Sequence, residues 1–190
     1  MEKSLKRKKN KTIEVELRGL LTKAQYDSLV QRFKKEKVKF EEDDKDTYFF
    51  NVPDGVFKLC DEKSKNRGKI SLKIGKEETG ALEEIEIIIK RDQIKPFFNF
   101  FAALGYMDFH HVPQKRKNYF LDGAELALKF TPDFQYHFEL EGELLSSAKQ
   151  INKEKKKLLD ICRHYKIVPL EPAEIASRIK EIRKRIGFEK

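Results

Sequence analysis

The segment Ile13-Glu14-Val15-Glu16-Leu17-Arg18 alternates apolar and charged residues without interruption. Successive side chains of a β-strand point to opposite faces, so this pattern predicts a strand whose glutamates and arginine share one face. The same two-residue period returns in later segments of comparable length, at 56–60, 69–74, 82–90 and 134–143. Turn signals such as Pro53-Asp54-Gly55 separate them. The chain is therefore expected to form a sheet of about eight short strands.

Helical patterns accompany these strands. Thr22 is expected to cap a helix over residues 24–35, and Asp92 a Phe-rich helix that ends near Gly105. Two further helical segments are expected after residue 146, the second opened by Glu171-Pro172. Strands with interspersed and terminal helices place the chain in the α+β class.

The charged faces of the strands carry both signs, with carboxylate pairs on some strands and lysines or arginines on others. An ordinary amphipathic sheet that exposes its charged face to water accounts for the alternation alone. A closed eight-stranded antiparallel β-barrel accounts better for the separation of the signs, because its interior has room for one small ligand. Helices would then cover the apolar outer face. Paired carboxylates suit hard divalent cations and facing cations suit phosphate oxygens, so a metal–polyphosphate ligand meets both requirements.

Several motifs, in order along the chain, resemble those of the CYTH domain, the triphosphate tunnel metalloenzymes. Residues 14–18 resemble E-x-E-x-[K/R], Asp46-Thr47-Tyr48-Phe49 resembles D-T-Y-F, and Ile70-Ser71-Leu72-Lys73 resembles L-T-x-K. Further matches are residues 83–86 with E-E-I-E, 104–106 with L-G-F, 112–119 with V-x-K-x-R-x-x-Y and 138–141 with the closing E-I-E. The matches span residues 13–141, about two thirds of the chain.

The resemblance implies roles for individual residues. It assigns Glu14, Glu16, Glu139 and Glu141 as ligands of Mg²⁺ or Mn²⁺, and Glu84 and Glu86 as acidic residues of the lumen that could add to them. Arg18, Lys58, Lys73 and Arg116 would bind the phosphates of inorganic triphosphate or a nucleoside triphosphate. The implied activity is phosphohydrolysis, or cyclisation as in class IV adenylate cyclases, and the resemblance does not choose between them.

Three positions depart from the family pattern. Gln114 stands where a lysine is expected, Cys60 where a second basic residue is expected, and Lys129 where the family has a metal-binding aspartate. These departures favour an alternative, a non-catalytic module that binds polyphosphate or nucleotide. RNA binding through the basic chain ends is a third and weaker alternative.

The charge is concentrated at the two ends of the chain. The net charge of +9 divides into +5 for residues 1–11, −3 for 12–148 and +7 for 149–190. We therefore expect a basic disordered arm at 1–11, a tunnel domain at 12–146 and a helical extension at 147–190. The slightly acidic middle argues against nucleic acid as the main partner.

The cellular setting is expected to be reducing. Two distant cysteines, Cys60 and Cys162, and the absence of a long apolar run predict a cytoplasmic protein without a membrane partner. A homodimer is compatible with this reading.

Overall fold

The computed structural model describes residues 15–52, 56–74, 83–143, 145 and 150–188, with the side chains of 73, 74, 83 and 84 left aside. Its strands are β1 (Glu16–Leu20), β2 (Phe40–Glu42), β3 (Lys45–Phe50), β4 (Val56–Glu62), β5 (Arg67–Ile74), β6 (Glu83–Lys90), β7 (Phe109–Leu121), β8 (Ala124–Thr131) and β9 (Gln135–Glu141). Its α-helices are α1 (Lys23–Lys35), α2 (Ile94–Ala103), α3 (Ile151–Tyr165) and α4 (Pro172–Arg185). The α+β class is confirmed.

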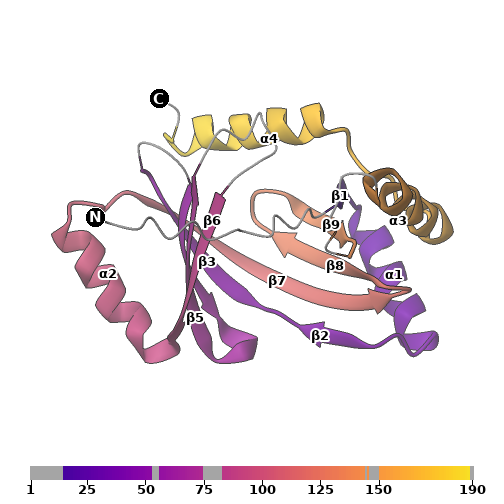
Figure 1. Ribbon diagram of the computed structural model, residues 1–190, viewed down its shortest axis with the longest axis horizontal. Coiled ribbons are helices and arrows are strands. Elements are labelled where there is room, and N and C mark those ends of the chain that lie inside the picture. The colour runs from indigo at the N-terminus through magenta and orange to yellow at the C-terminus, as the bar shows by residue number, and fades with distance from the viewer. Residues whose placement is uncertain (1–14, 53–55, 75–82, 144, 146–149, 189–190) are drawn as a thin grey trace, which may run out of the picture.

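The strands form one antiparallel sheet in the order β1-β9-β8-β7-β3-β4-β5-β6, with β2 paired to β7. The long strand β7 belongs to both halves of this curved sheet (Figure 1). The stretch between residues 38 and 51 forms two strands, β2 and β3, which Asp43 and Asp44 separate. The sheet thus gains a ninth, short strand.

Closure of the sheet into a barrel is not confirmed. No hydrogen-bonded ladder joins the edge strands β1 and β6 within the part of the chain that the structure describes. The outer edge of β1 is bonded by the segment that leads into α4, where the Leu170 amide donates to the Arg18 carbonyl at 2.7 Å. This segment passes close to Gly19, where an added Cβ would lie 2.4 Å from the Val168 carbonyl oxygen. A larger residue at position 19 would therefore displace it.

Helices cover most of the apolar face of the sheet, as the sequence predicts (Figure 1), although Ile85 and Ile87 of β6 remain 46% and 53% exposed. Beneath α1 and α3, one core cluster includes Phe33, Leu128, Phe138 and Leu158, all fully buried. Beneath α2, a second cluster is built from four buried residues, Phe50, Leu59, Ile70 and Ile89, packed against Phe97, Phe98 and Phe101. The charged residues of β1, β5 and β9 are directed to the opposite, concave face of the sheet, whereas Asp46 of β3 and Asp61 of β4 lie on the helix-covered face and pair with Lys63 and Arg91.

The helix termini agree in part with the sequence signals. Thr22 forms the expected capping box with Gln25: the Gln25 amide donates to the Thr22 hydroxyl at 3.2 Å. The prediction that Asp92 caps α2 is wrong, since Asp92 lies in a 3-10 turn and Gln93 is the N-cap. No helix among the described residues is long and apolar enough to span a bilayer.

Candidate functional site

Strand register brings the charged residues from distant parts of the sequence onto one face. Glu16 and Arg18 of β1 lie opposite Glu141 and Glu139 of β9. Farther along the sheet, Glu141 lies opposite Glu125 of β8. Lys129 of β8 pairs with Arg116 of β7, and β7 pairs in turn with β3. Because alternate residues of a strand share a face, polar residues of β3 to β6 lie on the same face as these two cations. The polar face therefore runs across the whole sheet.

Three carboxylates form a cluster at the β1–β9 end of this face. Oxygen atoms of Glu16, Glu139 and Glu141 all lie within 4.8 Å of one another. Arg18 binds Glu16 with two hydrogen bonds, from Nε at 2.5 Å and Nη2 at 2.9 Å. The Arg18 Nε also lies 3.4 Å from Glu139 Oε1. We call Glu16, Glu139 and Glu141 the carboxylate cluster.

Arg116 connects this cluster to the rest of the face. Its guanidinium lies 2.9 Å from Glu125, 3.5 Å from Glu139 and 3.7 Å from Glu141. A fourth carboxylate, Asp43, is 3.7 Å away. The Arg116 side chain is only 11% exposed, so these interactions are made largely out of contact with bulk water. Arg116 is the central cation of the site.

Lys129 is the least exposed cation of the site, at 5% for the whole residue, and its ammonium contacts Glu139. Burial, and then the positive charge of Arg116, lower the pKa of Lys129 below its ordinary value. Burial alone would raise the pKa of Glu139, but its cationic neighbours, Lys129 first, hold it well below the usual range. The neighbouring His137 ring has its pKa lowered to about 4 by burial and is neutral at pH 7. Glu139 is therefore an ionised carboxylate surrounded by cations.

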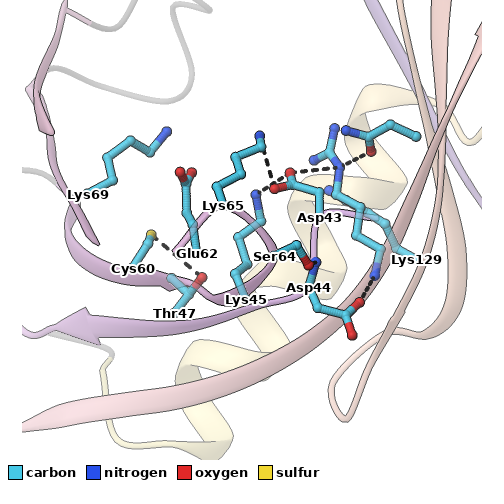
Figure 2. A network of polar contacts seen from close by, with 12 residues as sticks. Asp43, Asp44, Lys45, Thr47, Cys60, Glu62, Ser64, Lys65, Lys69 and Lys129 are labelled. Atoms are coloured by element: carbon cyan, nitrogen blue, oxygen red, sulfur yellow. Dashed lines mark hydrogen bonds and ion pairs between the residues drawn. The ribbon is translucent and has the colours of Figure 1, made fainter. Parts of the chain in front are cut away.

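The other half of the face, on β3 to β6, is richer in cations. Figure 2 shows Lys45 and Lys65 pointing toward Asp43, each at 3.0 Å from a carboxylate oxygen. Arg67 binds the buried Glu62 at 2.5 Å, and Lys69 binds Glu86 at 2.6 Å. The ammonium of Lys58 lies 5.9 Å from the centre of the Phe49 ring. Charge on the face thus changes from mainly acidic at β1 and β9 to mainly basic at β4 and β5.

The expected site residues fall into three groups. Five of them lie together: Glu16, Arg18, Arg116, Glu139 and Glu141. Lys58 and Glu86 lie on the same face in its basic half and outside the carboxylate cluster. Glu14 lies outside the described residues, as do the side chains of Lys73 and Glu84, whose backbones pair with each other in β5 and β6.

Some residues of the site were not expected from the sequence. Glu125 alternates with Leu126 and Leu128 in β8, so the same strand pattern would have identified it. Asp43 lies between two strands, where alternation gives no information about direction. Its carboxylate is recognised as part of the site only through its contacts with Arg116 and the two lysines.

The chemistry of the carboxylate cluster fits a hard divalent cation. Mg²⁺ and Mn²⁺ prefer oxygen ligands, and converging carboxylates supply them. The adjacent guanidinium groups of Arg18 and Arg116 match the geometry of phosphate oxygens. The face therefore offers both kinds of group that a metal–polyphosphate ligand requires.

Comparison with known proteins identifies the fold. No protein-family model matches the chain, and no curated protein matches it in sequence. Solved structures do match. The PH1012 protein of Pyrococcus horikoshii aligns with a TM-score of 0.64 and 16% identity, over 82% of this chain and 92% of that one. A protein from Vibrio parahaemolyticus, described as a proposed adenylate cyclase, aligns with a TM-score of 0.60 and 13% identity, over 86% and 97%.

A third structure is a proposed adenylyl cyclase from Hippeastrum, whose description reports a dominant triphosphatase activity. It aligns with a TM-score of 0.59 and 16% identity, over 84% of this chain and 90% of that one. At these identities the likeness concerns the fold. In its fold, therefore, the chain is similar to the PH1012 protein and to two proteins described as proposed adenylate cyclases, one of them with triphosphatase activity, which is consistent with the CYTH family that its motifs resemble.

Proposed function

We propose that this protein binds a triphosphate-bearing ligand, with a divalent cation, on the polar face of its sheet and acts on it by phosphoryl or nucleotidyl chemistry. The observation that carries the proposal is the arrangement of Arg18 and Arg116 around the carboxylate cluster. Solved structures of the same fold that are named as an adenylate cyclase and a triphosphatase support the class of ligand.

Different side chains would bind the metal ion and the phosphates. Glu16 and Glu141 would hold Mg²⁺ or Mn²⁺, and Glu139 lies next to them. The ion would neutralise phosphate charge and make the phosphorus more electrophilic. Arg18 is 44% exposed, so its guanidinium can leave Glu16 and turn to a phosphate. Arg116 is anchored by its carboxylate neighbours and would orient the chain of phosphates. In the basic half of the face, Lys58 would bind the far end of the triphosphate, together with Lys73 as the motif implies.

Closure of the sheet into a tunnel is part of the proposal. The polar residues already share one concave face, and a bound metal–polyphosphate ligand would attract the two halves toward each other, its cation contacting the acidic half and its phosphates the basic half. Closure would also exclude water from the phosphates, which strengthens the ionic contacts of both arginines.

Hydrolysis and cyclisation are distinguished by their products. The purified protein is incubated with tripolyphosphate and with ATP, each with Mg²⁺ or Mn²⁺, and phosphate, pyrophosphate and cyclic AMP are measured. Glu141→Gln should lower turnover at least tenfold, because it removes a ligand charge. Glu36→Gln, at the end of α1 and away from the polar face, is the matched control and should behave as wild type.

A non-catalytic binding module is the second candidate, favoured by the ammonium of Lys129 within the carboxylate cluster. It predicts tight tripolyphosphate binding in calorimetry without any product. A wild-type protein that binds neither tripolyphosphate nor ATP, with or without metal, would eliminate both candidates.

A further inference from the structure

Lys129 places a fixed positive charge where the candidate metal ligands meet. Its side chain is 6% exposed and its ammonium contacts Glu139, one of the three residues of the carboxylate cluster. Both flanking residues, Leu128 and Phe130, belong to strand β8, and Leu128 is fully buried on the opposite face. The Lys129 side chain therefore lies on the polar face of β8, where it is largely shielded from solvent.

The three carboxylates differ in how closely cations surround them. The Oε2 atom of Glu139 contacts the ammonium of Lys129 and lies 3.5 Å from the guanidinium of Arg116. Its other oxygen, Oε1, lies 3.4 Å from the guanidinium of Arg18. Its side chain is 15% exposed. A divalent ion bound to Glu139 would lie about 2 Å from its oxygen and so within a few ångströms of a buried ammonium. Like charges at this separation in a poorly solvated site repel strongly.

Glu16 and Glu141 are more accessible, with side chains 24% and 28% exposed. The cation bound to Glu16 is Arg18, which is exposed enough to move aside when an ion or a phosphate arrives. The structure therefore separates two more exposed carboxylates from a less exposed one that three cations surround.

We infer that Lys129 is a resident cation that takes the place of one divalent ion. It keeps Glu139 in an internal ion pair, so that a single ion is held by Glu16 and Glu141. Its charge remains in the site and offsets part of the charge of a polyphosphate when divalent metal is scarce. The inference rests on the proposed function for the identity of the anion, but its metal-binding part can be tested alone.

The first test measures how many Mn²⁺ ions each protein binds in the absence of any phosphate ligand. Electron paramagnetic resonance gives the concentration of free Mn²⁺ during the titration, and the bound ion is obtained by difference. Wild type should bind one Mn²⁺. Lys129→Met, which keeps the length of the side chain and removes its charge, should bind a second ion or bind the first at least tenfold more tightly. Lys115→Met is the matched control, because Lys115 is 75% exposed and pairs with Asp44 away from the carboxylate cluster, so it should match wild type.

A second pair of variants makes the test independent of the folding of Lys129→Met. If Glu139 is not a ligand, Glu139→Gln should weaken Mn²⁺ binding only through the loss of a nearby charge, and so clearly less than Glu141→Gln, which should weaken it at least tenfold. Lys129→Arg keeps the charge and should bind one ion, as wild type does. Equal losses in Glu139→Gln and Glu141→Gln, or a wild type that binds two ions or none, would overturn the inference.

The third measurement is calorimetric titration with tripolyphosphate in the presence of a chelator. Wild type and Lys115→Met should retain binding, and Lys129→Met should bind at least tenfold more weakly and regain affinity when Mn²⁺ replaces the chelator. Identical metal dependence in all three proteins would refute the role of Lys129 toward the anion. Failure of wild type to bind tripolyphosphate under any condition would refute the proposed function instead, while the Mn²⁺ counts would still decide the metal-binding part.

Discussion

Replacing Arg116 by methionine removes the cation that most of the carboxylates in the site share. The guanidinium lies within 3.7 Å of Asp43, Glu125, Glu139 and Glu141, and its side chain is 11% exposed. One pair of unit charges 4 Å apart interacts by about 4 kcal/mol at the effective dielectric constant of a protein surface. Desolvation of the arginine offsets part of this energy in wild type, so the four contacts do not add. Removing one partner of a buried ionic network costs about 3–5 kcal/mol, because the remaining charges lose their compensation.

This loss should appear as a lower melting temperature. For a chain of this size each kcal/mol corresponds to roughly 2–4 °C, so Arg116→Met should melt about 6–20 °C below wild type. Urea unfolding at pH 7.5 in the presence of a chelator, followed by circular dichroism, gives the change in the free energy of unfolding directly. Arg91→Met is the matched control, because Arg91 also binds a carboxylate with two hydrogen bonds, to Asp61, but is 44% exposed. Its removal should cost much less than that of Arg116, because exposed ion pairs contribute little to stability. Equal stability of the two variants would show that the site network contributes no more than a surface ion pair.

Three further predictions concern stability around the site. Leu128→Ala should lower the free energy of unfolding by about 2–5 kcal/mol in urea denaturation and leave tripolyphosphate affinity unchanged, because Leu128 is fully buried on the apolar face. Thr22→Ala should cost about 1 kcal/mol in the same assay, because it breaks the capping box of α1; an unchanged midpoint would argue against that cap. Burial would raise the pKa of Asp43, but Lys45 and Lys65 lower it below its ordinary value of 3.8. A carboxyl group whose pKa is lower in the folded state stabilises the protein above the unfolded pKa, and this contribution is lost as the pH falls below about 4. Asp43→Asn should therefore lose less stability than wild type between pH 5 and pH 3, and parallel pH profiles would contradict this reasoning.

Part of the candidate site could be predicted because strand alternation is a local property. Glu16 and Arg18 occupy one face of β1, and Glu139 and Glu141 one face of β9, as their spacing in the sequence requires. The departures at Lys129 and Gln114 were also visible in the sequence, although their surroundings were not. In the structure Lys129 contacts Glu139, whereas Gln114 has a buried side-chain oxygen for which no hydrogen-bond partner is found among the described residues.

The phenylalanines of α2 also show that a local sequence pattern does not decide which side chains are buried. Phe97, Phe98 and Phe101 pack on the sheet as expected of a covering helix, but Phe100 is 55% exposed. Helical spacing predicts that one face is apolar, and only packing decides which phenylalanine is left on the other.

The amino-acid sequence by itself determined the α+β class, most of the strands and helices, the polar and apolar faces of β1, β4, β5, β6 and β9, and the motifs that resemble the CYTH family. These follow from residues within one turn or a few positions of each other. Only the tertiary structure decided which charges meet: that β1 pairs with β9, that Arg116 reaches Glu125 of β8 and both Glu139 and Glu141 of β9, and that Asp43, between two strands, joins them. Cross-strand register and the course of the chain beside the free edge of β1 depend on contacts between residues more than a hundred positions apart. Such contacts arise only when the sheet packs against its helices, so no local pattern encodes them.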